Sequence, residues 1–324
     1  KLTHAPVITS LESKFYFLID RAALLGMARA FFSERGVLEA DCPALSHASP
    51  IDLHIDVMTV SVNESETGYL HTSPEYGMKR LLALGIGDIY QISHVYRAAE
   101  FGPLHNPEFT MAEWYRIGMT FPELMEETLA FIRLFLGEMS SSYLRYRDAL
   151  IHYAGIDYVD ASCSELLACA EKHKLGLPKD ADTWDKDTLL QLLVSFLVEP
   201  HLGKDQLDVL YDFPATQAAL ARTKDLEEEQ VAMRFEVYFR GIELANGYHE
   251  LTDPVEQRKR LEQSVQARIA AGKDPLKIDE HFLNALETGI PDCCGVAVGF
   301  DRLMLLRHNK ETLRDVLPFT WENA

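Results

Sequence analysis

The residues best placed to do chemistry lie in one stretch near the end of the chain, residues 241–252, which reads GIELANGYHELT. Glu243 and Glu250 stand seven residues apart, on either side of an Asn246-Gly247 pair. A carboxylate aimed from a strand into a cleft is costly unless a cation completes it, so two of them joined by a flexible turn predict a site for an ammonium group or Mg²⁺. Asn-Gly is also a common hairpin signal, and the competing interpretation is a hairpin with two solvated glutamates.

Composition sets the class of protein that could carry such a site. The chain has 324 residues, 47% of them hydrophobic, which suffices for a large core. It contains no long apolar run and no secretory signal, so we expect a soluble, cytoplasmic protein with no membrane partner. The formal net charge is −19 and no Lys/Arg cluster forms a basic face, which leaves nucleic-acid binding unsupported. The five cysteines are odd in number and lack C-x-x-C spacing, so we expect reduced, structural thiols, with any redox role of Cys293-Cys294 left open.

The order of the predicted elements indicates how the chain would position these residues. Helical periodicity predicts helices over residues 13–36, 121–138, 253–271, 279–288 and 301–308, and Ser73-Pro74-Glu75 has the residues of a helix start. Strand patterns cover residues 88–97, 108–116, 207–213, 235–240 and 295–299. We therefore expect a single domain over residues 1–324, of the α+β class, with a mainly antiparallel sheet flanked by helices and a helical insertion around residues 144–200.

Two arginines stand where they could meet a polyphosphate. Arg97 ends one predicted strand, and Arg302 follows the small-residue strand that contains Gly295 and Gly299. Guanidinium groups bind phosphate bidentately and stabilise charge that develops during its transfer. For either arginine alone, a surface ion pair explains the residue as well. The spacing of the two glycines matches neither a P-loop nor a Rossmann fingerprint. Glycine in a strand can allow close approach of a flat ligand such as adenine, and tight packing of the sheet explains it equally well.

Taken together, these segments resemble the three motifs of a class II aminoacyl-tRNA synthetase catalytic domain. The segment Arg21–Pro43 resembles motif 1, the dimerisation element, and residues 97–116 and 295–302 resemble motifs 2 and 3. Residues 243–250 resemble the lysine-pocket segment of lysyl-tRNA synthetases. The resemblance covers nearly the whole chain and implies a class II synthetase core that forms a homodimer through Arg21–Pro43.

Departures from the lysyl-tRNA synthetase pattern point to a paralogue of those enzymes. The sequence leaves no room before motif 1 for an anticodon-reading OB-fold, Ser73 stands where alanine is usual, and Ala297 stands where motif 3 usually has glycine. Residues 72–76, 105–111 and 241–253 closely resemble the elongation factor P–lysine ligase family. That resemblance implies ATP- and Mg²⁺-dependent activation of (R)-β-lysine as an adenylate and its transfer to a lysine side chain of elongation factor P, with tRNA not expected as a partner.

The resemblance also assigns roles to individual residues. It implies an amino-acid pocket with Glu250 holding an ammonium group, formed by Ser73, Glu75, Tyr115, Asn246 and Glu250. It implies a nucleotide site formed by Arg97, Glu100, Asn106, Glu243, Leu244, Gly299 and Arg302, with Mg²⁺ assigned to Glu243 and Glu250. Motif 2 usually reads Arg-x-Glu, but here Ala99 takes the glutamate position, so adenine recognition would need Glu100 or a backbone carbonyl. The alternatives are a lysine-activating paralogue that acts on tRNA or another acceptor, and a non-catalytic regulatory paralogue, which Ala99 favours.

Overall fold

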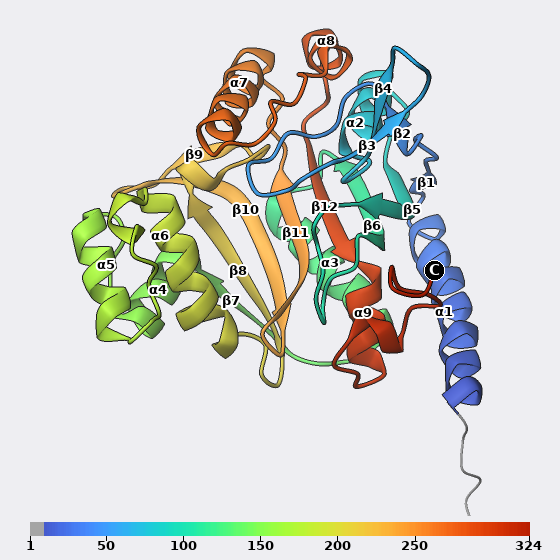
Figure 1. Cartoon of the computed structure of the whole chain (residues 1–324). Helices are drawn as coiled ribbons and strands as arrows, with labels where there is room; N and C mark the ends of the chain where they lie inside the picture. The colour runs from blue at the N-terminus through green and yellow to red at the C-terminus, as the bar shows by residue number, and fades with distance from the viewer. Residues whose placement is uncertain (1–9) are drawn as a thin grey trace, which may run out of the picture.

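Long antiparallel strands form the centre of the computed structural model, which describes residues 10–324 (Figure 1). One nine-stranded sheet has the order β1-β5-β6-β12-β11-β10-β8-β7, with β9 paired to β10, and a three-stranded sheet has the order β2-β4-β3. The pairs β1·β5 and β7·β8 are parallel, and the pairs between them are antiparallel. The predicted α+β class is confirmed. The strands are β1 Leu38–Glu39, β2 Leu45–Ser46, β3 Met58–Ser61, β4 Thr67–Leu70, β5 Ile89–Tyr96, β6 Glu108–Ile117, β7 Ser141–Arg145, β8 Leu207–Pro214, β9 Thr223–Asp225, β10 Gln230–Phe239, β11 Ile242–His249 and β12 Cys293–Gly299.

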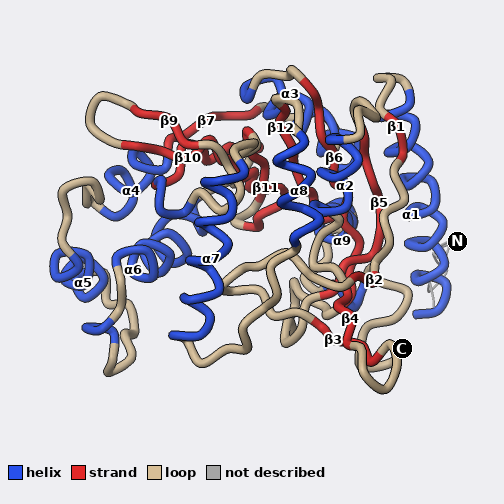
Figure 2. The backbone as a smooth tube through the Cα atoms, turned by 90° about the horizontal axis from the view of Figure 1, so that it is seen from above, coloured by secondary structure: helices blue, strands red, loops and turns tan. Residues whose placement is uncertain are grey.

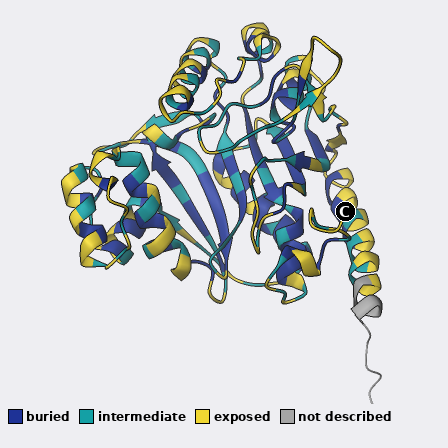
Figure 3. Cartoon of the chain, in the orientation of Figure 1, coloured by how far each residue is buried: buried dark blue, intermediate teal, exposed yellow. Residues whose placement is uncertain are grey.

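Helices cover both faces of the large sheet and one end of it. They are α1 Ser10–Ser33, α2 Glu75–Ala83, α3 Phe121–Leu136, α4 Tyr146–Ala154, α5 Cys163–Lys172, α6 Lys186–Leu193, α7 Pro254–Ala270, α8 Glu280–Thr288 and α9 Phe300–Arg307. Helices α1, α3 and α9 pack on one face around an aromatic core that includes Phe32, Trp114, Phe131 and Phe300. Figure 3 shows that the sheet itself is largely buried.

A lobe of three helices lies between β7 and β8 in the sequence, where a helical insertion is predicted. Helices α4, α5 and α6 pack around their own apolar cluster, which includes Tyr146, Leu166 and Leu190. Figures 1 and 2 both place this lobe at the end of the molecule opposite α1. The continuation of α6 is a π-helical turn over Val194–Val198 and a 3₁₀ turn over Glu199–His201, which lead into β8.

The Asn246-Gly247 pair is not a turn. Both residues lie inside β11, where Asn246 pairs with Glu236 and Gly247 pairs with Phe235 of β10. The hairpin turn is Arg240-Gly241, whose φ values are 52° and 70°, as a two-residue hairpin turn requires. Glycine is needed at position 247 because a Cβ there would lie 2.4 Å from the Phe235 ring. The predicted flexible turn is therefore wrong, and Glu250, which is 1% exposed, is not a solvated glutamate.

Candidate active site

A cavity of about 890 Å³ lies on the sheet face opposite the aromatic core. The strand alternation creates it: on β6, Glu113 and Tyr115 line the cavity, whereas Ala112 and Trp114 point into the core. Further wall comes from the motif 2 loop and from residues of α7. The structure brings every residue of the predicted site to this one cavity: Ser73, Glu75, Arg97, Glu100, Asn106, Tyr115, Glu243, Leu244, Asn246, Glu250, Gly299 and Arg302.

At one end of the cavity a buried lysine joins two carboxylates. Lys79 Nζ lies 2.6 Å from Glu75 Oε1 and 2.6 Å from Glu250 Oε2, and the Lys79 side chain is 1% exposed. Burial disfavours the charged amine, but Glu250 and Glu75 outweigh burial and hold the pKa of Lys79 above its ordinary value. The ammonium group at Glu250 Oε2 in this structure is thus that of Lys79. Lys79 is not among the site residues predicted from the sequence, although its i, i+4 spacing from Glu75 on α2 is visible there.

A third carboxyl group, Glu113, completes this end of the cavity and was also missed. Its Oε2 accepts a hydrogen bond from Ser73 Oγ at 2.8 Å, and its Oε1 accepts one from the Tyr115 hydroxyl at 2.7 Å. Burial and the nearby charge of Glu75 raise the pKa of Glu113 to about 8. Burial, opposed by Lys79, raises the pKa of Glu250 to about 7. Glu75 and Glu250 pair with Lys79, whereas Glu113 has no cationic partner, and a cation bound beside it would favour its ionised form.

Gly295 of β12 allows these groups to meet. A Cβ at position 295 would lie 2.4 Å from Tyr115 Cε1 and 2.5 Å from Glu250 Oε1. Close packing therefore explains this glycine, one of the two interpretations that the sequence left open. At Gly299 the nearest atoms to a Cβ belong to Arg302 and begin at 3.7 Å, so the strand end is not crowded there.

The other end of the cavity carries the two arginines. Arg302 Nη1 donates to the Glu243 carbonyl oxygen at 2.8 Å, and its Nη2 lies 3.1 Å from His105 Nε2. Arg97 Nη1 lies 3.6 Å from Glu100 Oε1, while its buried Nε has no partner within residues 10–324. Both arginines thus have local carboxylate or carbonyl partners and also face the same cavity. An unpartnered buried guanidinium nitrogen fits an anionic group at this end.

The loop between β5 and β6 shows how the chain is arranged around Ala99. Ala99 adopts a left-handed φ of 60°, and the N–H of Ala98 donates to the Asp56 carbonyl at 2.7 Å. Glu100 follows and lines the cavity. Asn106 donates from Nδ2 to the Glu108 carbonyl at 2.6 Å and accepts at Oδ1 from the Trp321 N–H at 3.1 Å. Its side chain therefore holds the loop to the C-terminal segment, which leaves its backbone for ligand contact.

The carboxylates do not form a metal site by themselves. In the described part of the chain, no three His, Cys, Asp or Glu side chains gather as they would around an ion. Because Glu243 and Glu250 are separated by seven residues of extended chain, roughly 23 Å, one ion cannot bridge them. Mg²⁺ in nucleotide sites is usually held by one or two carboxylates together with substrate phosphates, and Glu243 beside Arg302 fits that arrangement.

Comparison with known proteins agrees with this fold and cavity. Residues 9–323 match the family of tRNA synthetases class II (D, K and N). The chain is 46% identical over 312 residues to the "Elongation factor P--(R)-beta-lysine ligase" of Edwardsiella ictaluri, covering 95% of each chain. It is 45% identical to proteins of that name from Salmonella typhi and Haemophilus influenzae, again over 95% of each chain. The chain therefore belongs to the class II tRNA synthetase family and, within it, to the elongation factor P–(R)-β-lysine ligases, which confirms the resemblance seen in the sequence.

None of the helices in the described range combines the length and apolarity that a membrane crossing requires.

Proposed function

We propose that this chain uses ATP to activate (R)-β-lysine as an acyl-adenylate and transfers the β-lysyl group to a lysine side chain of elongation factor P. The observation that carries the proposal is a single cavity with buried carboxyl groups at one end and two arginines at the other. An acidic end suits a substrate with two amino groups, and a basic end suits a triphosphate. The names of the related proteins supply the particular amino acid and acceptor.

The acidic end would hold the amino acid. Glu75 and Glu250 share one buried lysine, and Glu113, whose pKa is raised to about 8, would ionise beside a substrate ammonium and pair with it. Ser73 and Tyr115 hold Glu113 by hydrogen bonds and so shape the same end. We assign amino-acid binding to Ser73, Glu75, Tyr115, Asn246 and Glu250, and add Glu113.

The basic end would hold ATP. Arg97 and Arg302 would bind the phosphates, and Mg²⁺, held by Glu243 and the phosphates, would neutralise their charge and polarise the α-phosphate. The remaining wall of the nucleotide site is assigned to Glu100, Leu244, Gly299 and the backbone of Asn106. With Ala99 in motif 2, Glu100 is the cavity-lining carboxylate available to read the adenine amino group.

The reaction has two steps. The carboxylate of β-lysine attacks the α-phosphorus, the bond to the β-phosphate oxygen breaks, and pyrophosphate leaves. The neutral amine of the acceptor lysine then attacks the adenylate carbonyl, an amide bond forms, AMP leaves and the amine loses a proton to solvent. The chain's own residues orient the reactants and stabilise the developing negative charge through the arginines, without a covalent enzyme intermediate.

Mass spectrometry of the acceptor tests the transfer step. Purified elongation factor P incubated with the enzyme, ATP, Mg²⁺ and (R)-β-lysine should gain one lysyl group on a lysine side chain. Adenylate formation without modification of this acceptor would favour the alternative that the chain serves tRNA or another acceptor. Loss of both half-reactions would favour a non-catalytic regulatory paralogue.

A location in the cytoplasm, where ATP and the translation apparatus are found, is part of the same proposal.

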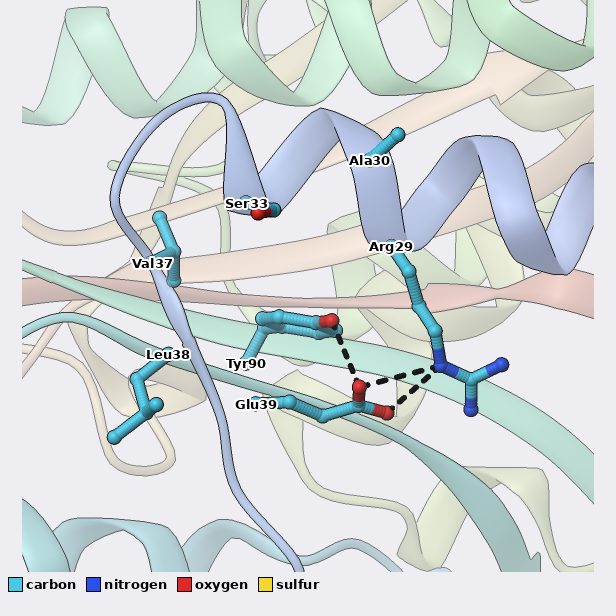
Figure 4. Close-up of a pocket in the computed structure, with 7 residues that line it drawn as sticks. All are labelled: Arg29, Ala30, Ser33, Val37, Leu38, Glu39 and Tyr90. Carbon is cyan, nitrogen blue, oxygen red and sulfur yellow. Dashed lines mark hydrogen bonds and ion pairs between the residues drawn. The ribbon is translucent and has the colours of Figure 1, made fainter.

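A homodimer formed through Arg21–Pro43 is also part of it. Exposed apolar side chains in this segment include Met27 of α1 and Leu38 of β1, which are 46% and 53% exposed. Arg21 instead faces inward, where its Nη1 lies 2.5 Å from Asp301 Oδ1 of α9. Arg29 of α1 and the Tyr90 hydroxyl both donate to Glu39 of β1 and tie the helix to this strand, at a shallow pocket of about 410 Å³ (Figure 4). A rigid segment with an exposed apolar face is suited to pairing with a second copy.

A further inference from the structure

Gln257 of α7 lines the cavity but has no role in the function proposed above. Its side chain is 0% exposed, and neither Oε1 nor Nε2 has a hydrogen-bond partner in the part of the chain that the structure describes. A buried polar group without a partner is costly, and here the acceptor and the donor of one amide both lack one. A cavity-lining amide of this kind indicates a ligand that supplies the missing partners.

The first turn of α7 fixes the backbone from which Gln257 projects. Asp253 caps the helix, because its Oδ1 accepts from the N–H groups of Val255 and Glu256 at 2.8 and 3.2 Å. The N–H of Gln257 donates to the Asp253 carbonyl oxygen at 3.0 Å. Gln257 therefore projects from a capped, ordered turn rather than from a loose helix end.

The contacts of α7 place Gln257 at the acidic end of the cavity. Arg260 lies three residues after Gln257, and its Nη1 donates to the Ala221 carbonyl oxygen at 2.7 Å. Ala221 forms a β-bridge with Glu250, the carboxylate that pairs with the buried lysine. Because residues three apart share a helix face, Gln257 is on the side of α7 that faces Glu250.

The packing of the next turn agrees with this placement. Leu261, four residues after Gln257, belongs to the apolar cluster that contains the Tyr115 ring. Tyr115 and Glu250 line the same cavity and are 2% and 1% exposed, so the residues at this end are buried although they border the cavity. Burial of Gln257 therefore does not separate it from a ligand that fills this end.

The acidic end needs an acceptor that is not already engaged. An ammonium group has three N–H donors, and each requires an acceptor when the group is buried. Glu75 and Glu250 both lie 2.6 Å from Lys79 Nζ. Both oxygens of Glu113 also accept hydrogen bonds. Gln257 Oε1 offers a further acceptor and adds no charge to a group of three buried carboxyls.

We propose that Gln257 is a further residue of the amino-acid pocket, where its Oε1 accepts a hydrogen bond from an ammonium group of the substrate. β-Lysine carries ammonium and carboxylate groups, so one ligand can supply the donor that Oε1 lacks and an acceptor for Nε2. The inference rests on the proposed function, since it takes the acidic end to be the amino-acid pocket. It adds a contact from α7, which supplies no other residue of that pocket.

Replacing the amide by an apolar group of similar size separates binding from stability. Gln257→Met removes two buried polar atoms that have no partner, so the urea midpoint should stay at the parent value or rise. In ATP–pyrophosphate exchange the KM for (R)-β-lysine should rise about 10- to 100-fold, as expected for one lost hydrogen bond to a charged group. The KM for ATP should stay within about twofold.

Two further variants bracket this result. Gln257→Glu keeps an acceptor oxygen in either protonation state, so its KM for β-lysine should stay closer to the parent value than that of Gln257→Met. Gln266→Met is the matched control, because Gln266 lies on the same helix but is exposed and does not line the cavity. The control should change neither KM nor the urea midpoint.

Analogues of the substrate show which ammonium group Gln257 contacts. Two analogues of β-lysine, each lacking one of its two amino groups, are measured as competitive inhibitors of exchange. Gln257→Met should weaken inhibition by the analogue that keeps the contacted group and leave inhibition by the other unchanged.

The other outcomes would overturn the binding role. A lower urea midpoint or failure of Gln257→Met to fold would show that the amide stabilises the fold instead. An unchanged KM for β-lysine, an equal rise in the KM for ATP, or equal weakening of both analogues would show that the amide does not meet the substrate. A parent enzyme that shows no exchange with β-lysine would instead overturn the proposed function itself.

Discussion

Replacing Lys79 by methionine tests the charge balance of the acidic end. The change keeps the length of the side chain and removes an ammonium group that lies 2.6 Å from both Glu75 and Glu250. Removing one partner of a buried ion pair leaves an uncompensated charge, which typically costs about 3–5 kcal/mol. Because Lys79 has two carboxylate partners, we expect Lys79→Met to lower the free energy of unfolding by an amount in this range.

The size of the loss should depend on pH. Burial already raises the pKa of Glu250 to about 7, and Lys79 opposes that rise. Without Lys79 the pKa of Glu250 in the folded variant rises further. Between the ordinary carboxyl pKa and this raised value, the folded variant binds more protons than the unfolded chain. Its stability must then fall as the pH rises through the folded pKa. The difference between parent and variant should be larger at pH 8 than at pH 6.

Urea denaturation at these two pH values measures both effects. Lys259→Met is a matched control, because the Lys259 side chain is 65% exposed and lies 3.9 Å from Glu256. The control should lose less than about 0.5 kcal/mol. A loss below about 1 kcal/mol for Lys79→Met at pH 8 would refute the view that Lys79 neutralises two buried carboxylates.

Three further predictions address the pocket and the assembly. Gly295→Ala would place a Cβ 2.4 Å from the Tyr115 ring, so we expect the free energy of unfolding to fall by about 1–3 kcal/mol and adenylate formation to be lost. Gly176→Ala, with nothing within 4 Å of the added Cβ, should change neither. Glu250 and Glu113, with pKa values raised to about 7 and about 8, must ionise to pair with a substrate ammonium, so the KM for β-lysine in pyrophosphate exchange should fall from pH 6 to pH 8; a flat profile would contradict this role. Met27→Glu, at an exposed residue of the proposed interface, should convert a dimer to a monomer in sedimentation velocity, whereas Val255→Glu, at a residue 77% exposed on α7, should not; a monomeric parent would exclude the proposed dimer.

Local patterns predicted the elements that carry the site but not how their side chains pair. The strands β5 and β6 and the helix α3 follow from alternation and helical periodicity, signals that act over a few residues. The Asn246-Gly247 turn failed because pairing of β11 with β10 and β12 outweighs a local turn preference.

The missing site residues share a physical cause. Lys79 looks in the sequence like a surface partner of Glu75, and its burial depends on α2 packing beside the end of β11, which no local pattern encodes. Glu113 is one carboxylate in an apolar strand, and its partners Ser73 and Tyr115 become visible once the strands are assembled. The roles of the predicted site residues came from family resemblance, and the structure adds that one cavity joins them.

ATP–pyrophosphate exchange with Mg²⁺, run in parallel with (R)-β-lysine and L-α-lysine, is the most direct test of the central claim. The proposed function predicts exchange that depends on the amino acid and strongly favours the β isomer, despite Ala99 in motif 2. Exchange with L-α-lysine alone would contradict the β-lysine assignment, and no exchange with either amino acid would contradict the claim that the cavity is a catalytic site.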